Sequence, residues 1–135
     1  MQVHVNYIAV IVAAIIQFML GALWYSPVLF AKKWIALIGL NPDTPSKGNM
    51  PLQFGSALIA ALISSHALAC IISLSASATI LSGAYIGFLC WLGFTAATSF
   101  TTSLFSRKPL QLWMIDEGYY LVSFVVAGGI LAVWQ

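Results

Sequence analysis

Four long apolar stretches, separated by short polar connections, dominate the chain. They cover about residues 5–25, 52–74, 79–105 and 110–134. A helix of roughly 20 mostly apolar residues is long enough to cross the hydrocarbon core of a bilayer. The pattern therefore predicts an all-α polytopic membrane protein, in which four transmembrane helices form a bundle and residues 1–135 form a single membrane domain.

A shorter amphipathic stretch follows the first span. Ser26 and Pro27 are residue types that favour a helix start. We therefore expect a short interfacial helix over about residues 27–38, with its lysines toward the headgroups. Its large apolar side chains should face the acyl chains: Phe30, Trp34 and Ile38. The alternative is an extension of the first helix that is kinked at Pro27.

The amino-acid composition indicates that most of the chain is surrounded by lipid and not by water. The chain is 61% hydrophobic and 6% charged, whereas soluble domains contain about 25% charged residues. The net charge of +2 gives no reason to expect a nucleic-acid partner. The first seven residues hold no lysine or arginine, so we expect the first apolar stretch to be a span and not a cleaved signal. Cys70 and Cys90 fall at different depths, which predicts two free thiols.

The basic residues predict the orientation. All five lie in the first and third connections between spans: Lys32, Lys33, Lys47, Arg107 and Lys108. The positive-inside rule places these connections in the cytoplasm and both termini outside, in a multi-pass protein of the cell (inner) membrane. Trp24 and Trp34 should act as interface anchors together with Lys32, Lys33, Arg107 and Lys108, because indole rings and basic side chains favour the membrane surface.

Small residues predict where helices approach each other closely. The second span repeats them at every fourth position, including Ala57, Ala61 and Ser65. The third span begins with Gly83-x-x-x-Gly87. Such residues let two membrane helices pack closely, either within one unit or between units.

Asp116 is the sharpest candidate for a functional side chain. It lies about 9 Å along the fourth span from its cytoplasmic end, where an acid should face the bundle interior. Tyr119 and Tyr120 follow at hydrogen-bonding spacing. The site is either a proton or cation site, or a structural anchor to the basic turn. Glu117 points about 100° away, and we expect it to reach the cytoplasmic interface.

Other polar residues lie at membrane depth. The hydroxyls of Thr98, Ser99 and Thr102, with Tyr25, either line a small polar cavity open to the cytoplasm or bond their own helix backbones. Gln17 is expected to bridge helices. His66 is expected to bond a neighbour and not a metal, because no further ligand stands at suitable spacing. Trp91 falls near the middle of the bilayer, away from the interface that indole rings prefer.

Two groups of residues resemble the signature of the domain of unknown function 1761 family. Residues 20–27 read Leu-Gly-Ala-Leu-Trp-Tyr-Ser-Pro and are followed by Phe30, Lys33 and Trp34. The second group comprises Leu104-Phe105 with Arg107 and Pro109, then Asp116 with Gly118-Tyr119. The resemblance covers nearly the whole chain. It implies a small bacterial or fungal integral membrane protein of this span number, and it implies no activity.

Two classes of function follow from these patterns. In the first, the protein is a homo-oligomeric or accessory membrane subunit that associates with itself or with another membrane protein in the lipid bilayer. In the second, it acts as an oligomeric transporter or channel for protons or a small solute through the region around Asp116. We expect no enzyme and no cofactor, because no nucleophile with a base, phosphate loop or metal motif is apparent.

Overall fold

The computed structural model describes residues 2–40 and 48–135, and these ranges are all-helical. Four stretches of helix are long and apolar enough to cross a membrane: Tyr7–Trp24 (α1), Met50–Leu74 (α3), Ile80–Phe105 and Leu110–Val133 (α6). The third stretch consists of α4 (Ile80–Cys90), a π-helix η1 (Trp91–Ala96) and α5 (Ala97–Phe105). A short helix α2 (Ala31–Ile38) follows α1. The predicted fold class is confirmed.

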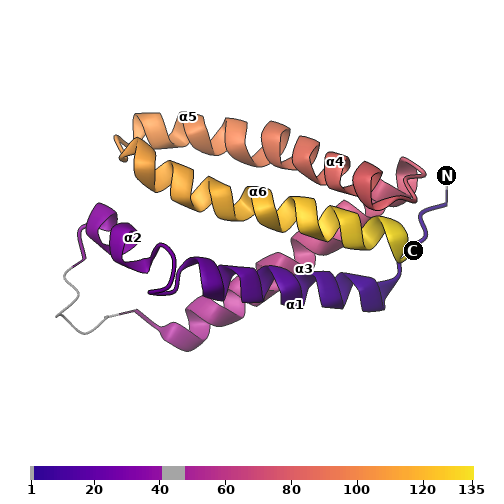
Figure 1. Ribbon diagram of the computed structural model, residues 1–135, viewed down its shortest axis with the longest axis horizontal. Coiled ribbons are helices and arrows are strands. Elements are labelled where there is room, and N and C mark those ends of the chain that lie inside the picture. The colour runs from indigo at the N-terminus through magenta and orange to yellow at the C-terminus, as the bar shows by residue number, and fades with distance from the viewer. Residues whose placement is uncertain (1, 41–47) are drawn as a thin grey trace.

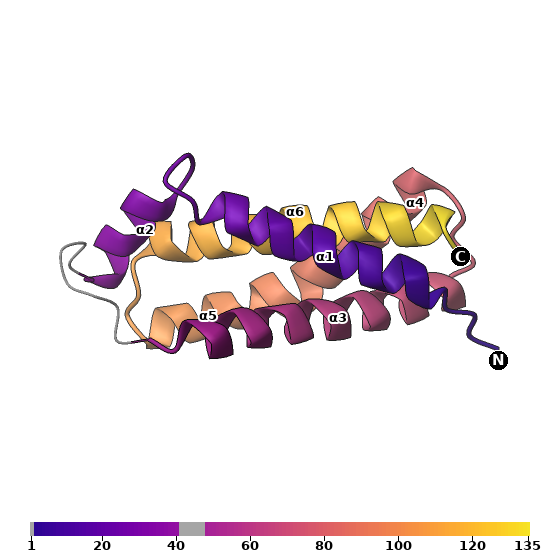
Figure 2. The same cartoon turned by 90° about the horizontal axis from the view of Figure 1, so that it is seen from below.

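Helix α6 is the centre of the bundle and touches every other helix. It lies between α1 and the α4–α5 stretch, and α3 crosses behind α1 (Figure 1). Seen from below, α1 and α6 form one layer, and α3 and α5 form the other (Figure 2). Buried apolar residues such as Ala13, Ile72 and Leu131 form a core in the half of the bundle near the chain ends.

Glycines bring α4 and α6 into direct backbone contact. A Cβ on Gly83 would collide with the carbonyl oxygen of Gly128 and the methyl group of Ala132. A Cβ on Gly87 would collide with the carbonyl oxygen of Phe124. Membrane helices gain their packing energy from such close approach. The Gly83 and Gly87 pair therefore lies at a contact within the unit.

The two ends of the bundle differ in charge. The N- and C-termini lie at one end, and α2 and the turn between α5 and α6 lie at the other (Figure 1). The second end carries Lys32 and Lys33 on α2 and Arg107 and Lys108 in the turn. Lys47 lies outside the described residues. The cytoplasmic placement of the basic end remains a prediction.

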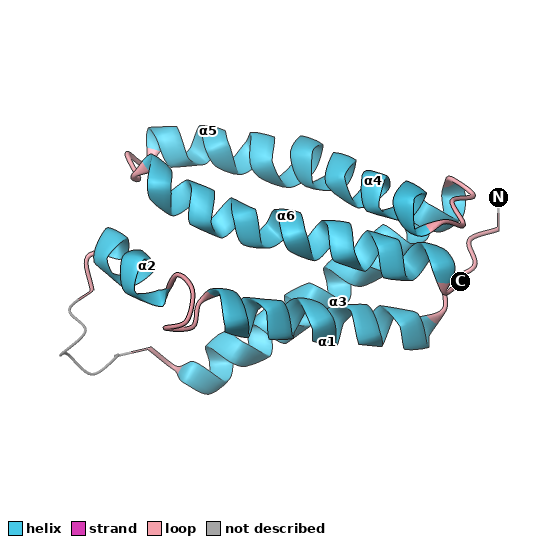
Figure 3. Cartoon of the chain, viewed as in Figure 1, coloured by secondary structure: helices cyan, strands magenta, loops and turns pink. Residues whose placement is uncertain are grey.

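The segment before α2 differs from the sequence expectation. The helix begins at Ala31, and the residues before it form a tight loop (Figure 3). The Ser26 hydroxyl donates back to the carbonyl of Leu23 and does not cap a new helix. The Phe30 and Ala31 amides bond the carbonyls of Trp24 and Ser26, which closes the chain into this loop. Those backbone bonds displace the start of the interfacial helix from Pro27.

The third span is interrupted by the π-helix η1, which the periodicity did not predict. Gly87 and Ser99 are separated by about one residue more than three α-helical turns. A π-turn absorbs an extra residue and so keeps both on the side that faces α6. This register is what allows α4 to pack on α6 through glycine while α5 presents hydroxyls to the same helix.

Candidate functional site

Asp116 ties α6 to the segment around α2. Its Oδ1 accepts a hydrogen bond of 2.7 Å from the Tyr25 hydroxyl and one of 3.1 Å from the Trp34 indole nitrogen. Burial raises the pKa of the Tyr25 hydroxyl above its ordinary value, and the hydrogen bond to Asp116 raises it further. Tyr25 therefore remains a protonated donor. The contact fastens the end of α1 and the start of α2 to the central helix.

Two neighbouring contacts extend this attachment. The Trp24 indole donates to the Ile115 carbonyl at 2.9 Å, and a Cβ on Gly118 would lie 3.0 Å from the Trp24 ring. Tyr119 donates to the Gln17 carbonyl at 3.0 Å. Parts of the two sequence groups that carry the family resemblance therefore meet: Trp24 and Tyr25 of the first group contact Gly118 and Asp116 of the second.

Glu117 is buried on the other side of α6. Its side chain is 4% exposed. One carboxyl oxygen accepts a 2.6 Å bond from the Ser99 hydroxyl, and the other accepts a 3.0 Å bond from the Trp91 indole. The Trp113 indole donates to Ser99 at 2.9 Å and holds that hydroxyl in place. Glu117 thus links α6 to both η1 and α5.

Two expectations about these residues are wrong. Glu117 does not reach the surface; it is the more buried of the two acids, because η1 and α5 cover it. Trp34 does not face the acyl chains, since its indole nitrogen finds an acceptor on Asp116. Asp116 does bond a tyrosine, as expected, and the donor is Tyr25 at the end of α1, whereas Tyr119 donates to the backbone of α1.

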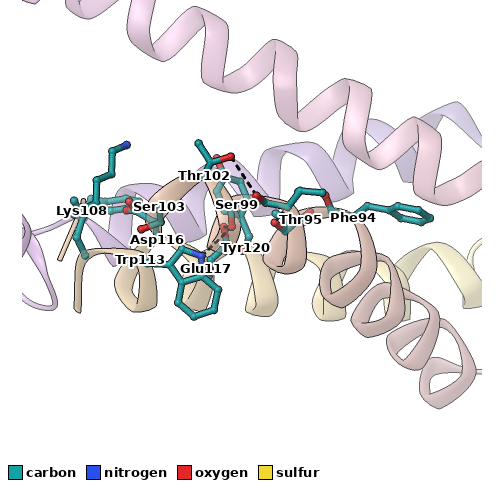
Figure 4. A pocket seen from close by; sticks show the side chains of 13 residues that line it. Phe94, Thr95, Ser99, Thr102, Ser103, Lys108, Trp113, Asp116, Glu117 and Tyr120 are labelled. Carbon is teal, nitrogen blue, oxygen red and sulfur yellow. Dashed lines mark hydrogen bonds between the residues drawn. The ribbon is translucent and has the colours of Figure 1, made fainter. Parts of the chain in front are cut away.

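Both acids line a cavity of about 630 Å³ between α6 and the η1–α5 stretch. Its wall combines carboxyls, hydroxyls, aromatic rings and one lysine: Tyr25, Phe94, Thr95, Thr98, Ser99, Thr102, Ser103, Lys108, Leu112, Trp113, Asp116, Glu117 and Tyr120. We call it the carboxylate pocket. In Figure 4, Lys108 lies at one end of the row, Phe94 lies at the other, and the two acids lie between them. Its volume falls within the range of small-molecule sites.

The hydroxyls of α5 serve in two ways. Thr98 and Thr102 donate to the carbonyls of Phe94 and Thr98, one turn earlier in the helix. Ser99 donates to Glu117 at 2.6 Å and makes only a longer contact of 3.3 Å with the Ala96 carbonyl of its own helix. All three still line the carboxylate pocket. The cavity expected from these residues is therefore present, although two of its hydroxyls also satisfy their own helix backbone.

The other residues singled out by sequence lie away from this pocket. Gln17 does bridge helices, because it donates to the fully buried Ser65 of α3 at 2.7 Å. Ala61 lies in the same contact region, whereas Ala57 is exposed. His66 stacks on the ring of Tyr7. Within residues 2–40 and 48–135, no group of three His, Cys, Asp or Glu side chains could hold a metal ion.

Trp91 and Trp113 contact the residues of the candidate site and were not predicted from the sequence to do so. Trp91 lies on η1 and binds Glu117, and Trp113 supports Ser99. The sequence feature that could have indicated the contact between Trp91 and Glu117 was the position of Trp91 in the middle of a span. An indole placed far from the interface needs an acceptor for its N–H, and the nearest acid in depth is Glu117.

Comparison with known proteins assigns the chain to a family but gives it no activity. The model of the family described as "Protein of unknown function (DUF1761)" matches residues 8–132. No curated protein and no solved structure matches the chain.

Proposed function

The chain belongs to the DUF1761 family, whose description assigns no activity, and we propose from its own site that it is a membrane protein that binds a small cationic solute. The carboxylate pocket is the binding site, and an oligomer moves the solute across the membrane. The observation that carries the proposal is the presence of two acids in one pocket. Neither forms an ion pair with a lysine or arginine of the described ranges.

The chemistry of the pocket favours a cation. Unpaired carboxylates attract positive charge, and the attraction is stronger in a site shielded from water. Aromatic faces add to it, because a cation within about 6 Å of a ring centroid is attracted to the π-system. Trp113, Tyr120 and Phe94 supply such rings. Lys108 lies at the end of the pocket opposite Phe94, so its repulsion of a bound cation decreases toward the Phe94 end (Figure 4).

Two features support assembly into an oligomer or with another membrane protein. The half of the bundle near the termini is filled by the apolar core and by the contact between α4 and α6, so we infer that the described part of one unit does not enclose a path across the membrane. Residues 51–60 of α3 are all exposed, and a Cβ on Gly55 would meet nothing within 4 Å. This helix surface offers small residues to a second membrane helix. The proposal includes no catalytic step and no cofactor.

Glu117→Gln is the variant that tests the site. Its amide oxygen can accept from Trp91, and its amide nitrogen can donate to Ser99. The Ser99 hydroxyl then turns to the Ala96 carbonyl, which already lies 3.3 Å away. The fold is therefore retained while the charge is removed.

The measurement is a titration of the detergent-purified protein with tetramethylammonium at constant ionic strength, followed by tryptophan fluorescence. We expect saturable binding that is weakened about tenfold or more by Glu117→Gln, because the loss of a charge partner costs at least about 1.4 kcal/mol. Lys32→Gln, which removes an exposed charge on α2, should leave binding unchanged. Equal binding by Glu117→Gln and the unsubstituted protein would overturn the proposal.

A further inference from the structure

Two smaller cavities adjoin the carboxylate pocket. One of about 250 Å³ lies between α3 and α6, and shares Thr95 and Tyr120 with the carboxylate pocket. A second of about 190 Å³ continues along α3, and shares Ser64 and Phe124 with the first. Thr95, on η1, lines all three cavities. Because neighbouring cavities share lining residues, they lie next to one another from the carboxylates into the bundle along α3, and we refer to the three together as the groove.

The groove changes from polar to apolar along its length. Its first part holds both carboxyls and Lys108. Its far part is bounded by residues such as Leu68, Ile71 and Cys90, with few polar atoms. Figure 4 shows Phe94 and Thr95 at the end of the polar row where this change begins.

Two local features keep the groove open. Small residues of α3, including Ala57, Ala60 and Ala67, form one wall and leave room beside η1. The π-turn of η1 brings Thr95 to the meeting point of the three cavities. π-Turns inside α-helices occur frequently at functional sites. Ala57 and Ala60 are exposed, so a hydrocarbon chain can reach the groove from the bilayer.

We infer that the ligand is a single-chain amphiphile with an ammonium head. The head lies against Asp116 and Glu117, and the hydrocarbon chain lies along α3 in the groove. Charge selects the head, because the unpaired carboxylates favour a cation over an anion of the same shape. Burial of methylene groups stabilises the bound chain. This inference rests on the proposed cation site and names its substrate class.

The test compares cations that share a head and differ in the chain. Tetramethylammonium, hexyltrimethylammonium and octyltrimethylammonium are titrated into the purified protein at one fixed concentration of a nonionic detergent. Affinity should rise by about tenfold or more from the first to the second, because each buried methylene contributes up to about 0.8 kcal/mol. Octyl sulfate should bind far more weakly than octyltrimethylammonium.

Two variants separate the groove from the head site. Ala60→Phe places a ring in the groove from an exposed position of α3, and should remove the dependence on chain length while tetramethylammonium still binds. Ala57→Phe is a second substitution of the same kind. Ala97→Phe makes the same change at an exposed position of α5 that lines none of these cavities, and should leave all affinities unchanged.

The outcomes distinguish the two proposals. If tetramethylammonium binds through Glu117 and chain length has no effect, the cation site stands and the amphiphile inference is overturned. If octyl sulfate and octyltrimethylammonium bind equally, the groove is only a lipid-facing surface, and the inference is again overturned. If no cation binds, both proposals are wrong.

Discussion

Asp116 and Glu117 are neighbours on α6, and their carboxyls serve different contacts. Asp116 is half-buried and accepts bonds from Tyr25 and Trp34, at the attachment of α2. Glu117 is buried and accepts from Trp91 and Ser99. The rotation of about 100° per residue separates the two directions. Asp116 is therefore chiefly an anchor that also borders the pocket, and Glu117 is the principal charge of the pocket.

The anchoring role makes a prediction for Asp116. Asp116→Asn keeps an oxygen at the position of Oδ1, so the Tyr25 and Trp34 bonds can persist and stability should change little. Asp116→Leu leaves both donors unpaired, which should lower the free energy of unfolding by about 1–3 kcal/mol. Both changes in the free energy of unfolding are measured by unfolding each purified variant and the unsubstituted protein in the same detergent. Equal loss in the two variants would show that charge, and not hydrogen bonding, is what Asp116 contributes.

At the scale of helices, the packing of α4 on α6 determines where the polar side chains of α5 lie. Gly83 and Gly87 place the backbone of α4 directly on α6, and the neighbouring π-turn then returns Ser99 to the same side. The site on α5 depends on this arrangement, because Ser99 must reach Glu117 from a helix that begins at Ala97, 14 residues after Gly83. Packing at one end of the span thus positions the polar groups at the other.

A matched pair of glycine variants tests that packing. Gly83→Ala forces a methyl group into the Gly128 carbonyl, and overpacking of this kind costs about 1–3 kcal/mol. Gly55→Ala adds the same methyl group to α3, where nothing lies within 4 Å, and should be neutral or stabilising by about 0.4–1 kcal/mol. Thermal unfolding and helix content of the two proteins provide the comparison. Equal stability of the two variants would contradict the contact between α4 and α6.

Features that depend on a repeating pattern of nearby residues could be predicted from the sequence. Runs of apolar residues predicted the four spans, and glycine spacing predicted a close helix contact. The π-turn was not predictable in this way, because an extra residue disturbs periodicity without any characteristic residue type. The choice between Asp116 and Glu117 was equally out of reach, since it depends on how α6 is rotated against α1 and η1. That rotation is set by long-range contacts such as Trp24 with Gly118.

At the scale of the whole molecule, charge separates the two ends. The described basic residues gather around α2 and the turn between α5 and α6, and the termini lie at the opposite end (Figure 1). The positive-inside rule predicts that the termini face outward. A single cysteine introduced at Gln2 or at Gln135, in a chain whose Cys70 and Cys90 are replaced by alanine, should react with a membrane-impermeant thiol reagent in intact cells. Protection of both positions until the cells are opened would reverse the orientation.

The groove that extends from the carboxylate pocket ends among apolar core residues such as Leu68 and Cys90, so the proposed movement of a solute requires an assembly or a rearrangement of the bundle. Cation transport through the carboxylate pocket is measured most directly as uptake of radiolabelled tetramethylammonium by lipid vesicles that contain the purified protein. We expect uptake above that of protein-free vesicles, little changed by Lys32→Gln and reduced about tenfold or more by Glu117→Gln. Uptake that equals the protein-free background, or that persists undiminished in Glu117→Gln, would contradict this proposal.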